Sequence, residues 1–235
     1  MKKQTYIIAE AGVNHNGSLE AAMKLISEAK RVGADAIKFQ TFKADELILK
    51  ETEKAAYQRN DVRETQFSML KKLELSHDDF KKLKEFSLNQ NIDFLSSAFD
   101  MDSLEFLISL NLPKYKLPSG EIITKPFLHK LGKLNKPLIL STGMSTIEEI
   151  ASSIEILYKS GLDKKNLTLL HCNTDYPTAF PDVHLNAMQN LKDTFGVPVG
   201  YSDHTVGNEI SIGAVALGAS IIEKHFTLDN SQEGP

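Results

Sequence analysis

Polar and ionisable side chains recur in this sequence at the ends of short apolar runs, and two of them are histidines. His204 follows the run that contains Ser202, and His225 follows the run that contains Glu223. Imidazoles at neighbouring strand ends can converge on one divalent ion, and two protein ligands leave coordination positions open. We therefore expect His204 and His225 to hold a catalytic metal that acts as a Lewis acid on a carbonyl group. The alternative is that either histidine is a hydrogen-bonded core or rim residue.

Two lysines also follow apolar residues at expected strand ends. In such places Lys38 and Lys116 would either bind an anion or form a Schiff base. The structural alternative is a lysine without a catalytic role whose ammonium group extends to the solvent at the barrel rim. Ser119, Asn173 and Ser202 end other runs. Together these groups read as a cradle for a phosphate or carboxylate group.

Three carboxylates end further runs: Glu10, Glu121 and Glu223. Carboxylates that converge near a metal and an anion are candidates for general acid and base catalysis. Each of them also has a structural reading as an ion pair to Lys38 or Lys116. Tyr176 either faces a sugar or packs its own loop.

The elements that would position these residues alternate along the whole chain. Eight short, apolar, β-branched runs are expected to be parallel strands buried on both faces: 5–11, 36–42, 92–99, 115–118, 137–142, 167–172, 198–202 and 220–226. Expected helices between them are 18–32, 63–75, 76–89, 101–110, 125–132, 145–160, 185–195 and 208–217. This order predicts a (β/α)8 TIM barrel in one domain over residues 1–235, with an active site at the carboxyl ends of the strands.

Two segments depart from the simplest barrel pattern. Residues 43–61 form a long polar connection, which indicates a functional lid. No helix follows the eighth strand before Pro235, so we expect a barrel that is truncated at its carboxyl end. Ser18 and Ser76 are predicted helix N-caps, and Gly33 a helix stop.

Composition narrows the class of protein. The 235 residues carry 27 basic and 31 acidic side chains and a net charge of −4, which does not indicate a nucleic-acid surface. The single cysteine, Cys172, allows no intrachain disulfide and fits a reducing compartment. The first lysines are not followed by an apolar stretch of the kind found in signal peptides, and no apolar run approaches about 18 residues. We therefore expect a cytoplasmic protein without a membrane partner.

Several motifs resemble those of the sialic acid synthase family. The matching segments run in order through nearly the whole chain: 8–17, 37–42, 115–121, 140–144, 170–172, 176–178, 200–205, 213–219 and 223–227. The resemblance implies a nonulosonic acid synthase, which condenses phosphoenolpyruvate with an N-acylated mannosamine-type sugar and releases phosphate. The segment 171–176 looks more like the legionaminic branch than the animal 9-phosphate synthases.

The resemblance also implies roles for individual residues. The divalent metal, manganese or magnesium, would be held by His204 and His225. Phosphoenolpyruvate would be held by Lys38, Lys116, Ser119 and Ser202. The groups that would face the sugar or handle protons are Glu10, Gln40, Glu121, Tyr176 and Glu223. Ser97 and Asn173 complete the expected substrate-binding set.

The sequence departs from the family pattern at three points. The family usually carries a carboxyl-terminal antifreeze-like domain, whose arginine reaches a partner subunit's site in a homodimer, and the 235 residues do not include a match to it. The chain ends just short of an acidic residue that lines the family's sugar site. Asn173 stands one position before the family's asparagine, and Thr174 occupies the usual place.

Two other functions remain open at this stage. One is a Schiff-base aldolase with Lys38 or Lys116 as the covalent lysine. The other is a non-catalytic barrel that binds an anionic sugar acid or a protein partner.

Overall fold

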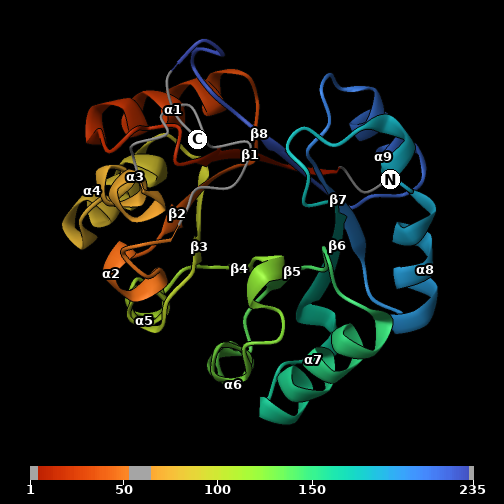
Figure 1. Cartoon of the computed structure of the whole chain (residues 1–235). Coiled ribbons are helices and arrows are strands. Elements are labelled where there is room, and N and C mark those ends of the chain that lie inside the picture. The colour runs from red at the N-terminus through yellow and green to blue at the C-terminus, as the bar shows by residue number, and fades with distance from the viewer. Residues whose placement is uncertain (1–4, 53–64, 233–235) are drawn as a thin grey trace. The chain divides into compact units, whose positions relative to one another are not determined.

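The structure is a computed structural model that describes residues 5–52 and 65–232 (Figure 1). Its contacts divide the chain into two compact units. Unit 1 comprises Met1–Ile8 and Leu112–His225, and unit 2 comprises Ala9–Asn111 and Phe226–Pro235. Strand β1 (Tyr6–Gly12) contributes residues to both units. The single domain over 1–235 therefore stays a prediction.

The strands form one eight-stranded sheet in the order β3-β2-β1-β8-β7-β6-β5-β4. Sequential strands are therefore neighbours from β1 to β3 and from β4 to β8, and β1 adjoins β8. The recorded pairings β2–β3, β4–β5, β5–β6, β6–β7 and β7–β8 are all parallel. Parallel strands in sequential order, alternating with helices, define the (β/α)8 barrel fold, which confirms the predicted fold class.

Unit 2 carries the first helices of the chain. In order, its elements after β1 are α1 (Leu19–Arg31), β2 (Ala36–Thr41), α2 (Ala44–Leu47), α3 (Gln66–Leu73), α4 (His77–Asn89), β3 (Asp93–Ala98) and α5 (Met101–Ser109). Ser18 caps α1 by accepting the Ala21 N–H, and Ser76 forms a capping box with Asp79 at α4. Gly33 follows α1 with a φ of 87°, as a helix stop requires.

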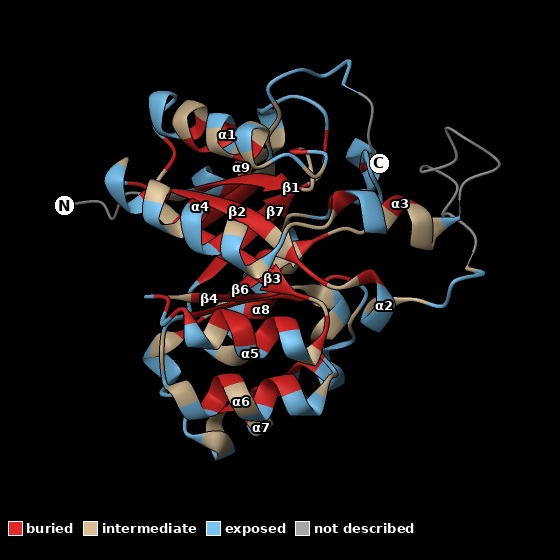
Figure 2. Cartoon of the chain, turned by 90° about the vertical axis from the view of Figure 1, so that its left-hand side faces the viewer, coloured by how far each residue is buried: buried red, intermediate tan, exposed pale blue. Residues whose placement is uncertain are grey.

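Unit 1 carries the remaining strands. Its elements are β4 (Tyr115–Leu117), η2 (Ser119–Glu121), α6 (Lys125–Leu134), β5 (Leu138–Ser141), α7 (Ile147–Ser160), η3 (Lys164–Asn166), β6 (Leu167–Cys172), η4 (Phe180–Asp182), α8 (Asn186–Phe195), β7 (Val199–Asp203), α9 (Glu209–Ala216) and β8 (Ile221–His225). In both units the strands are almost wholly buried, whereas the helices show one buried and one exposed face (Figure 2).

The predicted strands agree with the observed ones to within one residue at each end, and α2 is the helix that the prediction missed. Part of the predicted helix 63–75 and part of the predicted lid 43–61 lie outside the described residues, so the lid stays a prediction. Among the helices of the described residues, none is long and apolar enough to cross a membrane.

The register of the parallel strands decides which side chains share a face. Cys172 on β6 pairs with Ser202 on β7, and Ser202 pairs with Glu223 on β8. These three side chains therefore point to one face of the sheet, because paired residues of neighbouring strands point the same way. His171 and Tyr201 pair with each other on the opposite face, where their rings lie 5.5 Å apart.

The middle of β7 fits between its neighbours only because it carries a glycine. A Cβ on Gly200 would lie 2.4 Å from the Ile221 carbonyl oxygen and 2.7 Å from Leu170 Cδ2. We predict that Gly200→Ala lowers the free energy of unfolding by about 1–3 kcal/mol, the usual cost of overpacking. Urea denaturation measures this loss.

The matched control is Gly213→Ala in α9, where the new Cβ would meet only Leu185 Cδ1 at 3.4 Å. Alanine is the better helix former, so this variant is expected to be neutral or more stable. Equal stability of the two variants would contradict the close approach at β7.

Candidate active site

Four polar residues gather where β7 and β8 end in unit 1. The Ser202 hydroxyl donates to Glu223 Oε1 at 2.9 Å, and its oxygen lies 3.3 Å from His204 Nε2. The rings of His204 and His225 lie edge to face, with centroids 5.4 Å apart. The structure therefore brings together four of the residues that the sequence predicted for one site.

The hydrogen bonding of His204 fixes its tautomer. His204 Nδ1 lies 2.6 Å from the carbonyl oxygen of Asn173, which can only accept, so Nδ1 carries the proton. Nε2 is then the nitrogen with the lone pair. An imidazole that donates one N–H to a carbonyl oxygen and presents its other nitrogen is the usual arrangement of a metal-ligating histidine.

Tyr176 lies against both histidines. Its ring centroid is 4.4 Å from that of His204 and 5.7 Å from that of His225. The side chain is also partly open, with 42% of the residue exposed. Tyr176 therefore lines the histidine pair and remains accessible to a ligand.

Lys116 on β4 lies on the same side of the sheet. Its Nζ donates to Ser141 Oγ at 2.8 Å and lies 3.7 Å from Glu223 Oε1. The Lys116 and Glu223 side chains are only 2% and 7% exposed. The two opposite charges therefore lie next to each other in the interior, which offsets part of the high cost of burying either one alone.

A narrow cradle surrounds Gly143 after β5. A Cβ at this position would lie 2.9 Å from Cys172 Sγ, 3.2 Å from Ser119 Oγ and 3.2 Å from Thr174 Cγ2. Only glycine leaves this space open. Burial raises the pKa of the Cys172 thiol, which fits a small core residue and not a nucleophile.

Two predicted residues of unit 1 make other contacts. Glu121, in η2, accepts a hydrogen bond from Thr124 Oγ1 at 2.7 Å. The side-chain amide of Asn173 donates to the Asp182 carbonyl oxygen at 2.7 Å. Through its main chain Asn173 orients His204, a role that the sequence analysis did not foresee, and its predicted substrate contact stays a prediction.

Unit 2 has its own cluster at the ends of β1, β2 and β3. Lys38 Nζ and Glu10 Oε2 lie 2.7 Å apart, and each side chain is 5% exposed. A Cβ on Gly12 would lie 3.5 Å from Glu10 Oε1 and 3.7 Å from Gln40 Nε2, so these side chains gather around the glycine. Gln40 pairs with Ser97, whose buried hydroxyl has no hydrogen-bond partner among the described residues.

The loop after β1 contains a buried histidine that is not among the predicted site residues. His15 is 1% exposed, and its Nδ1 accepts the Gly17 N–H at 3.1 Å. Burial lowers its pKa from 6.5 to about 4, so it is neutral near pH 7. The Asn-His-Asn-Gly run is the signal that marks this loop.

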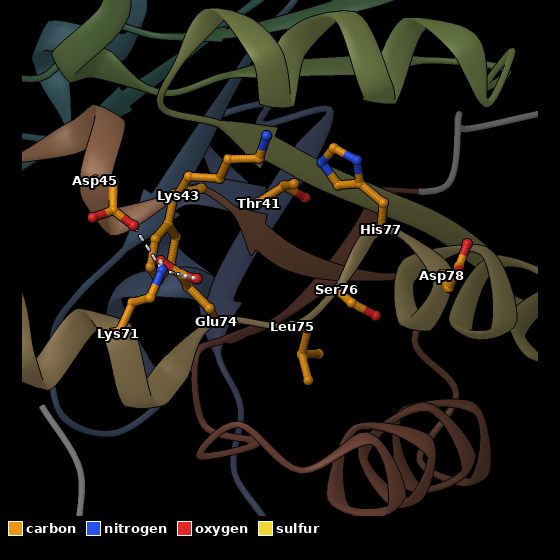
Figure 3. Close-up of a pocket in the computed structure, with 10 residues that line it drawn as sticks. Thr41, Lys43, Asp45, Lys71, Glu74, Leu75, Ser76, His77 and Asp78 are labelled. Atoms are coloured by element: carbon orange, nitrogen blue, oxygen red, sulfur yellow. Dashed lines mark hydrogen bonds and ion pairs between the residues drawn. The ribbon is translucent and has the colours of Figure 1, made fainter.

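A separate pocket of about 410 Å³ lies in unit 2, near the start of α4 (Figure 3). Its charged lining is largely paired, because Lys71 contacts both Asp45 Oδ2 at 2.8 Å and Glu74 Oε2 at 3.1 Å. None of the predicted site residues lines this pocket. The pocket is therefore distinct from the two clusters described above.

The metal prediction rests on the two histidines. Among the residues that the structure describes, no group of three or more His, Cys, Asp or Glu side chains could hold a metal ion. The sequence predicted a site with two protein ligands, His204 and His225, and the metal remains a proposal.

Comparison with known proteins identifies the family. The model of the NeuB family matches residues 25–235. The chain belongs to the NeuB family. The N,N'-diacetyllegionaminic acid synthase of Campylobacter jejuni is 53% identical over 99% of this chain and 70% of its own length. The enzyme of the same name from Legionella pneumophila is 50% identical over 98% of this chain and 66% of its own length. The chain thus spans about two thirds of these curated relatives.

A solved structure supports the fold. The N-acetylneuraminic acid synthetase of Leptospira borgpetersenii, crystallised in complex with citrate, superposes with a TM-score of 0.86 at 36% identity. The match covers 98% of this chain and 75% of that chain. The predicted membership of the sialic acid synthase family is confirmed.

The buried His15 predicts a pH dependence of stability. Its folded pKa of about 4 lies below its ordinary value of 6.5, so the neutral form is favoured in the folded state. This contribution to the free energy of unfolding is fully present above pH 6.5. As the pH falls towards 4, the free energy of unfolding decreases by about 3 kcal/mol in total. We predict that His15→Asn, which keeps an acceptor near Gly17, removes this dependence.

The measurement is the free energy of unfolding of both proteins between pH 7.5 and about 4.5. His129→Asn, at an exposed histidine of α6, is the control and should follow the wild type. Parallel pH profiles for wild type and His15→Asn would show that His15 is not the titrating group.

Proposed function

We propose that this protein condenses phosphoenolpyruvate with an N-acylated mannosamine-type sugar to give a nonulosonic acid and phosphate. The observation that carries the proposal is the cluster of Lys116, Ser202, His204, Glu223 and His225, which combines a buried cation with two facing imidazoles. The identity to named legionaminic acid synthases supports the same reaction.

We propose that His204 and His225 hold a divalent metal, manganese or magnesium. The fit rests on the tautomer of His204. Its Nδ1–H donates to the Asn173 carbonyl oxygen, so the lone pair that could bind a metal is on Nε2. When bound, the metal would supply Lewis acidity to the sugar aldehyde.

The other groups of unit 1 would bind and orient the anionic substrate. Lys116 would supply positive charge, and Ser119 beside the open cradle at Gly143 would donate a hydrogen bond to an anion. Ser202 would be a further contact. Glu223, held by Ser202 and Lys116, and Glu121 are proposed to handle protons, while Tyr176 would face the sugar.

Unit 2 has its own groups of the same kinds, and we propose a role for each of them as the family resemblance implies. Lys38 would contact phosphoenolpyruvate, and its partner Glu10 would handle a proton. Gln40 would donate a hydrogen bond to substrate. Ser97, whose buried hydroxyl has no hydrogen-bond partner in the described part of the chain, would donate another, because such a hydroxyl costs free energy until a ligand satisfies it.

The proposed reaction consumes phosphoenolpyruvate, the sugar and water, and it gives the keto acid and phosphate. C3 of phosphoenolpyruvate attacks the aldehyde carbon of the open-chain sugar, and the aldehyde oxygen gains a proton to become a hydroxyl group. Water adds to the resulting cation at C2 and loses a proton. The C2 hydroxyl of the tetrahedral intermediate then loses its proton and becomes the keto group as the C2–O bond to phosphate breaks, and the phosphate leaves with that proton. Glu10, Glu121 and Glu223 are the candidate proton carriers.

For the acceptor we propose a 2,4-diacetamido trideoxy sugar of the legionaminic type. Two relatives that are 53% and 50% identical to this chain over the aligned residues are each named N,N'-diacetyllegionaminic acid synthase. We also propose that the protein is cytoplasmic, and that its full-length form is a homodimer as the family resemblance implies.

The Schiff-base aldolase is the weaker candidate. Lys38 and Lys116 each lie close to a carboxylate, at 2.7 and 3.7 Å, and such pairing favours the charged ammonium over the nucleophilic amine. Borohydride trapping in the presence of a keto acid is the test, and a trapped lysine would overturn the proposed reaction.

The proposed function predicts sugar-dependent phosphate release from phosphoenolpyruvate with Mn²⁺. The 2,4-diacetamido trideoxy sugar is expected to be preferred over N-acetylmannosamine. Chelator should abolish the release, and His204→Ala and His225→Ala should each lower it at least about 100-fold, because each removes one of two protein ligands.

His129→Ala, at an exposed histidine, controls for the loss of an imidazole and should retain full activity. Phosphate release that needs no sugar, or that survives both the chelator and His204→Ala, would contradict the proposed function.

A further inference from the structure

An ion pair lies on the opposite face of β7 and β8 from the proposed metal ligands. Asp203 stands between Ser202 and His204, and Lys224 stands between Glu223 and His225. Because successive residues of a strand point to opposite faces, Asp203 and Lys224 face away from the proposed site. They are paired in the register of the two strands, and Lys224 Nζ lies 2.9 Å from Asp203 Oδ2.

Asp203 is unusually well satisfied for a buried carboxylate. Its side chain is fully buried, at 0% exposed. Oδ1 accepts the Thr205 N–H at 2.9 Å and the Thr205 hydroxyl at 2.7 Å. Oδ2 accepts the Ser211 hydroxyl at 2.5 Å as well as the Lys224 ammonium. One carboxylate thus joins β7, the loop after it, the start of α9 and β8.

Lys224 contacts the same loop from β8. Its Nζ donates to the Thr205 carbonyl oxygen at 2.9 Å in addition to its contact with Asp203. Thr205 is therefore held at its N–H, its hydroxyl and its carbonyl oxygen by two side chains.

The loop that Asp203 and Lys224 contact at Thr205 also contains His204. Strand β7 ends at Asp203, which forms the last residue pair with β8, opposite Lys224. His204 comes after this pair, so the pairing of β7 with β8 does not set its position. Its backbone is fixed instead by its neighbours and by the Thr178 N–H, which donates to the His204 carbonyl oxygen at 2.9 Å.

We propose that Asp203 and Lys224 are positioning residues that set the distance and direction of His204 relative to His225. The inference rests on the proposed function, in which these two histidines hold a metal. Lys224 fixes the chain on both sides of His204 and directly precedes His225, so a change in this pair moves one ligand against the other. Outer contacts of this kind typically change metal affinity by about 10- to 100-fold.

The test separates positioning from simple stabilisation by measuring metal binding and stability in the same variants. The variants are Asp203→Asn, Lys224→Met and Lys224→Arg, with Ser211→Ala as a milder change to the same carboxylate. Mn²⁺ affinity is read from the electron paramagnetic resonance signal of the free ion, and thermal unfolding is followed by circular dichroism. Affinities are compared at a temperature at which every variant is folded.

The matched control is Asp100→Asn in unit 2. Asp100 is also buried, caps α5 through the Ser103 N–H at 2.7 Å, and accepts the Lys43 N–H at 2.9 Å. This variant loses comparable hydrogen bonds at a residue that does not adjoin either histidine in the chain. It should lower the unfolding temperature and leave the Mn²⁺ affinity unchanged.

We expect Asp203→Asn and Lys224→Met to weaken Mn²⁺ binding at least about tenfold. Lys224→Arg, which keeps the charge, should recover most of the affinity. If Asp203→Asn does not fold, Lys224→Met and Ser211→Ala decide the question.

Unchanged Mn²⁺ affinity in variants that lose stability as Asp100→Asn does would overturn the inference and leave the pair a purely structural one. A wild-type protein that does not bind Mn²⁺ would instead overturn the proposed metal, and the inference with it. The two failures are therefore distinguishable.

Discussion

A charged side chain removed from water must meet an opposite charge, and the polar clusters of this protein depend on that constraint. Lys38 with Glu10, and Lys116 with Glu223, are almost completely buried pairs near the carboxyl ends of strands. Removing one member of such a pair leaves an uncompensated charge and commonly costs about 3–5 kcal/mol. The pairs therefore hold opposite charges together in the interior, among the residues that we propose bind substrate.

The parallel strands decide on which face of the sheet each buried charge lies. In a strand, alternate residues face opposite ways, so one strand can carry a reactive group on one face and its support on the other. On β7, Ser202 faces the proposed site while Asp203 faces the loop and α9. On β8, Glu223 faces the proposed site and contacts Ser202, while Lys224 faces the other way and contacts Asp203. Binding groups and the groups that hold them are therefore adjacent in the sequence.

This adjacency explains what the sequence could and could not predict. Short apolar runs that end in polar residues mark parallel strands strongly, and β6 was predicted with its observed bounds. The residue types at strand ends also picked out side chains that the structure brings together, such as His204 and Glu223 on either side of Ser202. Hydrogen-bond direction is decided by packing, however, so the sequence could not show that Asn173 holds His204 through its main chain. Nor does it show that Asp203 supports the histidine loop, since a buried acid and a site acid look alike before the fold is known.

The most direct test of the proposed reaction follows the oxygen atom that bridges C2 and phosphorus in phosphoenolpyruvate. With ¹⁸O in that position, ³¹P nuclear magnetic resonance shows whether the released phosphate carries the label. Attack by C3, addition of water at C2 and loss of phosphate break the C2–O bond, so the account predicts labelled phosphate, formed in equal amount with the keto acid. Unlabelled phosphate would show that the P–O bond breaks, and it would contradict a condensing synthase.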